Sequence, residues 1–596
     1  MPSELLPALP DGAASVLPPM PVSVWNVITP PDDAAVQALA HALRLPSLLA
    51  QLLIQRDITD PEAARQFLNP SLDDLYDPFD LPDMEKAVSR LALAIENKEK
   101  IFLHGDYDAD GVTSAALCLR ALVSLGADVL GYVPRRSEGY DLQIVGVDRA
   151  KACGATLILT ADCGVCAVEP VKYARSLGIE VIVTDHHRPG KALPDAVAIV
   201  NPYRDDSTTS FKDLCGAGVA FKVMDALVQR LAPEHRAAFH RNFVDLVALG
   251  TVADCTPIIR ENRVLVAHGL KALAEAKKTG IKALLLSMDI AGRPLDTEDI
   301  SFKLGPRLNA AGRIEDADLA FRLLVTRDQD EAEQLAVQIG ALAEKSREET
   351  ARVTTEALID ALSPEHQSRR VLVLARERWG KGVVGIAAAR IVEHCRKPVI
   401  LLSFDSKTEH WHGSARSWGA FDLHKSLQNC AELLTSFGGH SSAAGVSLPK
   451  DNLLAFQERL HELAEGEIDE TALLPTINID AEVEDASRLS FGFMEQLNRL
   501  APFGRENEEP LFVTYGAVVL SARRVGKDGN TFTLQAKLPG MTGSMKAVWF
   551  KNGDWADRLQ TGDEIDLVYS PKINEWRGNA SVELSLKDLR LSEANR

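Results

Sequence analysis

The sequence is short of cysteine, aromatic side chains, long apolar runs and positive charge. Only 8 of 596 residues are cysteine and 6% are aromatic, and the cysteines follow no framework spacing. A disulfide-stapled secreted scaffold is therefore excluded. No run of 18 uncharged apolar residues occurs, so we predict no transmembrane helix. Lys and Arg number 65 against 84 Asp and Glu, for a net charge of −19. This excludes a surface that is basic all over, but not a local basic patch or an acidic metal site.

Basic residues are also missing from the start of the chain, where the first is Arg44. The start therefore does not resemble a secretory signal, and its many prolines predict an extended leader. Scattered thiols favour a reducing, cytoplasmic setting. Cys163 and Cys166 form a CxxC pair, but no second pair stands at zinc-site spacing, so we expect spectator thiols.

Length and residue pattern predict several domains, since a chain of this size has room for roughly three to five. Short apolar runs alternate with amphipathic stretches from about residue 100, which predicts βαβ units and a parallel sheet. Residues 328–362 have helical periodicity, and short strands with Gly-containing turns follow residue 475, which predicts a small β-barrel. The predicted parts are a leader and helical entry segment (1–80), a catalytic α/β domain (81–330), a connector helix (331–365), a second α/β domain (366–468) and a β-barrel domain (469–596).

The first motif that carries chemistry is His104-Gly-Asp-Tyr-Asp-Ala-Asp-Gly111, directly after a predicted strand at 101–103. Three carboxylates and an imidazole this close repel one another unless cations neutralise them. An extended loop would place Asp108 and Asp110 on one side, because side chains alternate, with a helix predicted from 113 to 125. The alternative is a turn or a calcium loop, but no glutamate stands where an EF-hand requires one.

Three further acidic motifs follow, two at the ends of predicted strands and one near a glycine turn. They are Leu159-Thr-Ala-Asp-Cys-Gly164, Val183-Thr-Asp-His-His187 and Leu249-Gly-Thr-Val-Ala-Asp254. Strand ends of a parallel sheet meet at one edge, so we expect these side chains to share a crevice. Oxygen-rich ligation with little imidazole selects Mg²⁺ or Mn²⁺ over zinc. So many ligands indicate two ions that clamp a phosphoryl group, which predicts phosphodiester or phosphoanhydride hydrolysis.

These four motifs resemble those of the DHH phosphoesterase superfamily, named for the triplet at Asp185-His186-His187. Further motifs are similar to those of the RecJ single-strand exonucleases: Leu304-Gly-Pro-Arg-Leu-Asn-Ala-Ala-Gly-Arg313, Gly413-Ser-Ala-Arg-Ser417, Phe421-Asp-Leu-His424, Gly438-Gly-His-Ser-Ser-Ala-Ala-Gly445 and Pro502-Phe-Gly-Arg-Glu-Asn507. The resemblance runs from about residue 25 to the end, in family order. It implies an α/β fold: a DHH parallel-sheet domain and a DHHA1 α/β domain joined by a long helix, plus a C-terminal OB-fold β-barrel.

The resemblance also implies roles for individual residues. The implied ligands of one ion are His104, Asp108 and Asp162, and those of the other are Asp110, Asp162, His186 and Asp254. Asp162 would bridge the ions, with a hydroxide between them as nucleophile. His187 would contact the scissile phosphate, so the implied catalytic residues are Asp162 and His187.

A second set of residues would hold the nucleotide. The implied substrate-binding residues are Arg136, Arg307, Asn309, Arg313, Ser414, Arg416 and His440. A terminal 5′-phosphate carries more negative charge than an internal phosphodiester, so fixed cationic donors on both lobes would select strand ends. For Arg307 and Arg313 the alternative is ordinary surface ion pairing.

Two positions depart from the family pattern. Gly380-Lys381 stands where a histidine is expected after Trp379, which bears on how the nucleotide is held. Asp141 stands where glycine usually follows Gly139-Tyr140. Neither departure is expected to touch a metal ligand.

The barrel reverses the charge of the chain, because residues 511–555 hold six basic side chains against two acidic ones. We therefore expect this lobe to guide the strand. The charged residues are Arg523, Arg524, Lys527, Lys537, Lys546 and Lys551 against Asp528 and Asp554, and the aromatic residues are Tyr515, Phe532, Trp549 and Phe550. Some of these aromatics must be barrel core. We also expect truncation after about residue 470 to leave the catalytic sheet folded.

Taken with the resemblance, the sequence implies a metal-dependent, single-stranded-DNA-specific 5′→3′ exonuclease that releases 5′-mononucleotides in DNA repair and recombination. Two Mn²⁺ or Mg²⁺ ions are the implied cofactors. Single-strand-binding protein and repair helicases are the implied partners, without a membrane. The alternatives are an oligonucleotide or cyclic-dinucleotide phosphodiesterase, a pyrophosphatase, or a non-catalytic single-strand DNA-binding scaffold. The phosphodiesterases and pyrophosphatases are usually shorter and lack the barrel, and the scaffold is disfavoured because every ligand position is filled.

Overall fold

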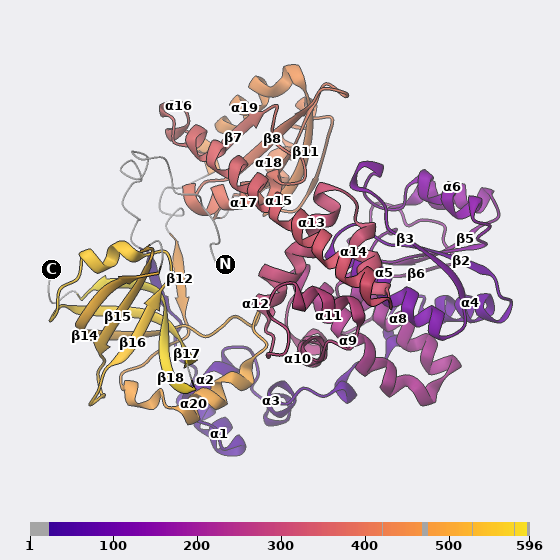
Figure 1. The fold of residues 1–596 in the computed structure, drawn as a ribbon. Coiled ribbons are helices and arrows are strands. Elements are labelled where there is room, and N and C mark those ends of the chain that lie inside the picture. The colour runs from indigo at the N-terminus through magenta and orange to yellow at the C-terminus, as the bar shows by residue number, and fades with distance from the viewer. Residues whose placement is uncertain (1–22, 420, 468–474, 527–528, 577, 593–596) are drawn as a thin grey trace. The chain divides into compact units, whose positions relative to one another are not determined.

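The computed structural model describes residues 23–419, 421–467, 475–526, 529–576 and 578–592 (Figure 1). The chain divides into two compact units. The larger comprises Asn26–Gly340 with Asn478–Arg596, and the smaller comprises Met1–Trp25 with Ala341–Ile477. In the described part of the chain, no helix combines the length and apolar character that crossing a bilayer requires.

A five-stranded parallel sheet lies at the centre of the catalytic part of the larger unit, in the order β3-β2-β4-β5-β6. Its strands are β2 (Lys100–His104), β3 (Asp128–Tyr132), β4 (Leu157–Thr160), β5 (Glu180–Thr184) and β6 (Ala198–Val200). The chain runs from β2 outward to β3 and then crosses back to β4 on the other side of β2. The strand order therefore reverses between β2 and β4, the place where open α/β sheets bind ligands at their carboxyl ends.

Side chains of alternate strand residues pack in two separate cores, one on each face of the sheet, because both faces are covered by helices. Leu103 and Leu159 pack in the core formed with one set of helices, whereas Phe102 and Ile158 pack on the opposite face. The first set comprises α4 (Met84–Glu96), α5 (Ala109–Ser124), α8 (Gly216–Leu231) and α9 (Arg236–Ala253), and the second α6 (Ile144–Ala152) and α7 (Val168–Ser176). Further helices complete the first side: α10 (Arg260–Glu275), α11 (Thr279–Leu286), α12 (Thr297–Asp299), α13 (Gly305–Ile314) and α14 (Asp318–Val325).

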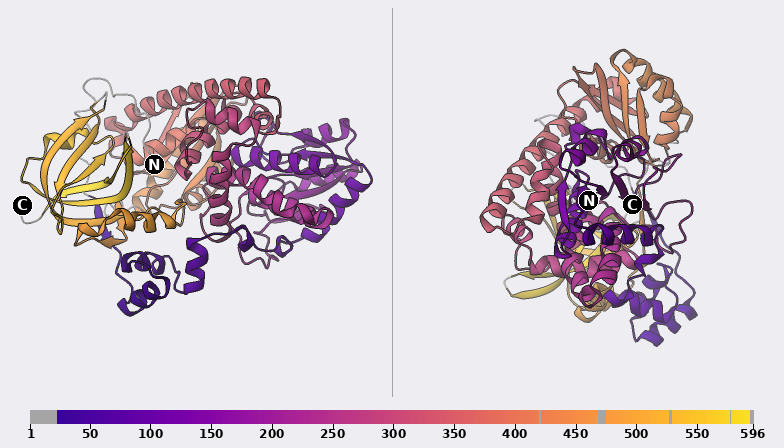
Figure 2. Two further views of the ribbon diagram at one scale, coloured as in Figure 1. Left: turned by 60° about the horizontal axis from the view of Figure 1, so that its bottom comes forward. Right: turned by 90° about the vertical axis from the view of Figure 1, so that its right-hand side faces the viewer.

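A single helix of 33 residues, α15 (Gln329–Ala361), leads from the larger unit into the smaller one. Figure 2 shows it without a break. The sequence predicts a connector at this place from its helical periodicity. Val353, Ala357 and Leu358 of α15 pack in a core of the smaller unit.

The smaller unit is built on a mixed sheet in the order β10-β11-β9-β8-β7, in which only the β7–β8 pair is parallel. Its strands are β7 (Leu372–Arg376), β8 (Val399–Asp405), β9 (His410–Arg416), β10 (Ser436–Gly439) and β11 (Ala443–Pro449). Helix α17 (Val384–Cys395) covers one face together with α15. Helices α18 (Leu423–Gln428) and α19 (Leu453–Glu467) contribute to the core on the other face.

The C-terminal strands close into a ring, because β14 pairs with both β15 and β17 and the order continues β15-β16-β18-β17. The strands are β13 (Ala481–Glu482), β14 (Phe512–Val525), β15 (Thr531–Lys537), β16 (Met545–Trp549), β17 (Glu564–Trp576) and β18 (Asn579–Leu591). Helix α20 (Phe491–Leu497) precedes β14. This is the small barrel that the sequence predicts.

The N-terminal helices pack with the C-terminal barrel. Apolar side chains of α1 (Asp33–Leu43), α2 (Ser47–Ile54) and α3 (Pro61–Leu68) share one core with the barrel and α20, and β1 (Val24–Val27) pairs with β12 (Thr476–Ile479). The core of the barrel therefore extends beyond the predicted boundary at residue 469 and includes helices near the start of the chain. Truncation near residue 470 would expose the apolar faces of these helices to water.

Candidate active site

The acidic motif after β2 turns into a helix earlier than its extended pattern predicts. Helix α5 begins at Ala109, and Asp108 is its N-cap, with Oδ1 accepting the Gly111 amide at 3.0 Å. A capping aspartate satisfies a backbone donor that the helix start leaves open. Asp108 and Asp110 therefore do not share one side of an extended loop. Asp110 lies in the first helical turn and points toward α8.

Asp110 is buried against the N-terminus of α8. Its two carboxylate oxygens accept the amides of Gly216 and Ala217 at 2.6 and 2.9 Å. These amides are the unpaired donors of a helix start, which favour negative charge. A Cβ atom at Gly250 would lie 2.4 Å from Asp110 Oδ1, so this position must be glycine. Burial nevertheless raises the pKa of Asp110.

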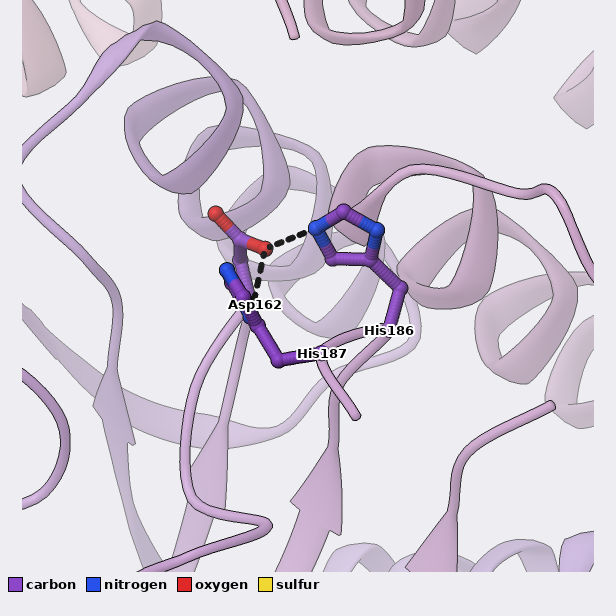
Figure 3. A group of neighbouring side chains, drawn as sticks. All are labelled: Asp162, His186 and His187. Carbon is purple, nitrogen blue, oxygen red and sulfur yellow. Dashed lines mark ion pairs between the residues drawn. The ribbon is translucent and has the colours of Figure 1, made fainter. Parts of the chain in front are cut away.

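Asp162 faces both histidines of the pair, and Figure 3 shows dashed lines from one of its carboxylate oxygens to each ring. It is 2% exposed and has a left-handed backbone, with φ at 67°. Its Oδ1 atom lies 3.2 Å from His186 Nε2 and 3.9 Å from His187 Nδ1, yet accepts no hydrogen bond. A Cβ atom at Gly216 would lie 2.3 Å from Asp162 Oδ1. Burial and the neighbouring charge of Asp110 raise the pKa of Asp162 well above its usual range.

His187 is held between a carboxylate and a phenol. Its Nδ1 lies 2.8 Å from Asp185 Oδ1, and its Nε2 lies 2.8 Å from the Tyr140 hydroxyl oxygen. Burial alone would lower the pKa of His187, but the hydrogen bond and charge of Asp185 raise it to about 9. Neither Asp185 nor Tyr140 is assigned a role by sequence reasoning, although Asp185 belongs to the triplet that identifies the superfamily.

Three groups of side chains each bring their ligand atoms within 4.8 Å of one another. The groups are Asp162, His186 and His187; Asp110, His186 and Asp254; and Asp106, Asp108 and Asp162. Asp162 and His186 each belong to two of them. Five of the six expected metal ligands therefore gather at one place, at the carboxyl edge of the sheet.

His104 lies apart from these groups, and Asp106 joins them instead. The His104 ring is buried with Nδ1 3.6 Å from Cys163 Sγ, and burial lowers the pKa of His104 to about 4. A Cβ atom at Gly146 would press on its ring at 2.8 Å. Asp106 is 3% exposed, and its Oδ1 atom has no hydrogen-bond partner. The alternation of acids in the motif is the signal that identifies Asp106 as a further candidate ligand.

The donor set fits a hard divalent cation. Its atoms are carboxylate oxygens with imidazole nitrogens and no thiolate, the combination that suits magnesium or manganese. Buried carboxylate oxygens without a partner are costly unless a cation meets them, and both Asp106 and Asp162 have one. Burial and repulsion between neighbouring carboxylates raise the pKa of Asp106 and of Asp254 to about 8. Two positive ions would remove that repulsion.

The expected nucleotide-binding residues of the larger unit have different surroundings. Asn309, on α13, accepts the Ala109 amide through Oδ1 at 2.8 Å and so caps α5. Arg307 Nη1 donates to Ser287 Oγ at 3.1 Å, and Arg313 lies in the last turn of the same helix. The Arg136 guanidinium lies 4.5 Å from the centre of the Tyr107 ring, inside the acidic motif.

The smaller unit holds the other expected substrate residues. On β9, Arg416 Nη1 donates to Ser414 Oγ at 2.8 Å. A Cβ atom at Gly385, in the first turn of α17, would lie 3.1 Å from Ser414 Oγ and 3.4 Å from Arg416 Nη2. A hydroxyl, a guanidinium and a helix N-terminus thus meet at one place, which is the chemistry of a phosphate site. His440 is exposed at the end of β10.

The two departures from the family pattern have different surroundings. Asp141 has φ at 71° and accepts the Gly164 amide at 2.5 Å, so it binds the backbone of the loop that begins at Asp162. Burial raises the pKa of Asp141 to about 6. Lys381 forms an exposed ion pair with Asp405, N to O 2.7 Å.

The barrel surface is less basic than its local count predicts. Arg524 pairs with Asp557 and Lys546 pairs with Glu583, and both acids lie outside the counted segment. Lys527 and Asp528 lie outside the described residues. Phe532 and Trp549 are core, whereas Tyr515 and Phe550 are exposed, Phe550 by 68%.

Three family models match the chain in order: the N-terminal domain of the DHH family at residues 100–251, the DHHA1 domain at 368–466 and the RecJ OB domain at 479–588. The single-stranded-DNA-specific exonuclease RecJ of Bacillus subtilis is 37% identical over 573 residues, 96% of this chain and 71% of that protein. RecJ of Escherichia coli is 36% identical over 568 residues, 91% of this chain and 96% of that protein.

Solved structures agree with this relationship. The crystal structure of Thermus thermophilus RecJ with Mn²⁺ matches with a TM-score of 0.81 and 30% identity, covering 96% of this chain and 80% of that one. The Mg²⁺ complex of the same protein matches with a TM-score of 0.76 and 29% identity. The predicted fold, a parallel-sheet DHH domain, a DHHA1 domain and an OB barrel, is thereby confirmed. The chain belongs to the RecJ family of single-stranded-DNA-specific exonucleases.

Proposed function

We propose that this protein is a metal-dependent exonuclease that hydrolyses phosphodiester bonds of single-stranded DNA in the 5′→3′ direction and releases 5′-mononucleotides. The observation that carries the proposal is the buried Asp162 carboxylate. One of its oxygens has no hydrogen-bond partner, and it stands in two clusters of ligand atoms at once. Membership of the RecJ family supplies the substrate class.

The acidic residues and His186 would hold the two metal ions. His186, Asp110 and Asp254 would hold one divalent ion, with Asp162 shared between it and a second ion held by Asp108. For the second ion, Asp106 is the further ligand within reach, and His104 is the one the family implies. Bound Mn²⁺ or Mg²⁺ supplies Lewis acidity toward the phosphoryl oxygens and activates water.

His187 would meet the scissile phosphate. Its Nδ1 is engaged by Asp185, which fixes the ring orientation and favours the protonated form. Its Nε2 faces Tyr140, a partner that a phosphate oxygen can replace. An imidazolium in this position stabilises negative charge that grows on the phosphoryl oxygens.

The direction of digestion follows from recognition of the strand end. Ser414 and Arg416, beside the first turn of α17, would bind a terminal 5′-phosphate, and each cut leaves a new 5′-phosphate for the same site. Arg136, Arg307, Arg313 and His440 would contact the backbone. Action in the cytoplasm, with single-strand-binding protein and repair helicases as partners, is the setting that family membership supports.

The test is digestion of long single strands labelled at the 5′ or the 3′ end, with Mn²⁺, Mg²⁺ or a chelator. A 5′ label should appear at once as mononucleotide, whereas a 3′ label should remain on shortening strands, and the chelator should stop both reactions. Mononucleotides released first from the 3′ end, or digestion that survives the chelator, would contradict the proposal.

A further inference from the structure

The chain segment between α20 and β14 contacts the turn that follows Asp254. The Ile258 amide donates to the Arg505 carbonyl at 2.8 Å, and Arg505 Nη1 donates to the Cys255 carbonyl at 3.4 Å. A Cβ atom at Gly504 would lie 2.6 Å from Ile258 Cγ1, so the close approach requires glycine. Residues 499–507 therefore hold both ends of the turn 255–258.

The turn 255–258 follows Asp254 directly in the chain. Asp254 is the C-cap of α9, and Cys255, the next residue, has a left-handed backbone with φ at 56°. Thr256 then bonds back to the Thr251 carbonyl at 3.1 Å through its amide. The Asp254 carboxylate stands between the helix and this turn, with Oδ2 3.9 Å from His186 Nε2.

The 499–507 segment is itself anchored by a buried arginine of the catalytic domain. Arg263 lies on α10, which is labelled in Figure 1, and is 2% exposed. Within the described residues, its guanidinium donates hydrogen bonds only to backbone carbonyls. The acceptors are Phe67 at 2.8 Å, Arg499 at 2.9 Å, Leu500 at 2.7 Å, Ala501 at 2.8 Å and Pro502 at 3.4 Å. Burial lowers the pKa of Arg263 to about 9.

Two further side chains complete the anchor. Asn507, 1% exposed, donates through Nδ2 to the carbonyls of Leu500 and Pro502, both at 2.9 Å. Thr297 Oγ1, on α12, donates to the Phe503 carbonyl at 2.6 Å. Arg263 and Thr297 thus bind five consecutive carbonyls of the segment from the catalytic domain, which restrains its conformation, because losing a donor leaves a shielded acceptor unpaired.

We propose that residues 499–507 are a positioning element for the metal centre, holding Asp254 in its ligand geometry and so making metal binding depend on attachment of the barrel. This rests on the role of Asp254 in the proposed function. A segment that only ties two domains together would affect the stability of the protein but not its affinity for metal. Groups that orient metal ligands without touching the metal commonly change metal affinity by about 10- to 100-fold when removed.

The experiment uses the full chain with Gly504→Ala, which presses a methyl group on Ile258, and Arg505→Ala, which removes an exposed guanidinium. The matched controls are Gly492→Ala, where nothing lies within 4 Å of the added Cβ, and Arg488→Ala, whose side chain is 79% exposed. Mn²⁺ binding is measured by titration calorimetry without DNA, together with kcat and KM on a short single strand.

We expect Gly504→Ala to weaken Mn²⁺ binding at one site by about 10- to 100-fold, with kcat falling and KM for the strand little changed. Arg505→Ala should weaken Mn²⁺ binding in the same direction by a smaller factor. Both controls should match the parent. If both variants bind Mn²⁺ as the parent does, the positioning role is overturned. If Gly504→Ala fails to fold, Arg505→Ala decides alone. A parent that binds no Mn²⁺ would instead overturn the proposed function.

Discussion

The Nδ1 atom of His187 lies 2.8 Å from Oδ1 of Asp185. The same carboxylate accepts the backbone amides of His186 and His187 through Oδ1 and that of Val165 through Oδ2. One buried side chain thus fixes the ring of His187, the backbone of the histidine pair and the loop after Asp162. Asp185 need not touch the metal or the substrate to control the reaction.

Replacing Asp185 with Asn should lower kcat by roughly 10- to 100-fold, the usual cost of losing such a support. The amide keeps the size of the side chain but removes the charge that stabilises protonated His187. Steady-state kinetics on a short strand gives the result. The control is Asp148→Asn, since within the described part of the chain the Asp148 carboxylate accepts a side-chain hydrogen bond only from the Tyr173 hydroxyl. An unchanged kcat would show that orientation of His187 does not matter.

The acidic cluster should make metal-free protein less stable as pH rises. Burial and neighbouring carboxylates raise the pKa of Asp106 and Asp254 to about 8, above the ordinary value of 3.8. The folded state therefore binds their protons more tightly than the unfolded state, and loses stability as pH increases from about 4 to about 8. Mn²⁺ takes the place of these protons, so its stabilising effect should be larger at pH 8 than at pH 5.5.

Thermal unfolding with Mn²⁺ and with a chelator at the two pH values measures this effect. The difference in Tm between the two conditions should grow with pH in the parent and grow less in Asp254→Asn. Equal differences at both pH values would mean that the clustered carboxylates are not the groups that metal binding deprotonates.

Arg416 should determine the activity of the protein on strands that carry a 5′-phosphate. Arg416→Ala removes a charge-assisted hydrogen bond worth about 1.5–3 kcal/mol, so activity on 5′-phosphorylated strands should fall roughly 10- to 150-fold. Strands with a 5′-hydroxyl should be affected far less. Arg369→Ala, which breaks the Arg369–Glu458 pair on the surface of the same unit, is the control. Equal loss on both substrates would assign Arg416 to the backbone instead.

Phe550 should contribute to binding of long strands, because it is a large aromatic side chain left 68% exposed on the barrel. Stacking of a base on an aromatic ring is worth about 1–3 kcal/mol, so Phe550→Ala should weaken binding by roughly 5- to 150-fold. Hydrolysis of dinucleotides should not change. The control is Phe491→Ala, at the first residue of α20, where the side chain is 47% exposed. An unaltered affinity would remove this face of the barrel from the strand path.

The positions of the acids could be predicted from sequence because strand ends of a parallel sheet converge at one edge, which needs only the order of strands and motifs. The local predictions that the structure does not match depend on contacts between particular residues. The start of α5 at Ala109 requires the cap from Asp108, and the capping role of Asn309 requires α13 to lie against that helix. The carbonyls of Phe67 and Leu500, which accept hydrogen bonds from Arg263, belong to residues more than 190 positions away from it in the sequence. No local pattern reveals such contacts.

The most direct test of the central claim is Mn²⁺ titration and strand digestion on one variant, Asp162→Ala, in which both ions lose a shared ligand. The two-ion account predicts a fall in the number or affinity of bound Mn²⁺ ions and a loss of cleavage by several orders of magnitude, about 4 kcal/mol or more of transition-state stabilisation. Binding of single strands should largely persist, as the barrel is untouched. Near-normal cleavage with the Asp162 carboxylate removed would contradict the account.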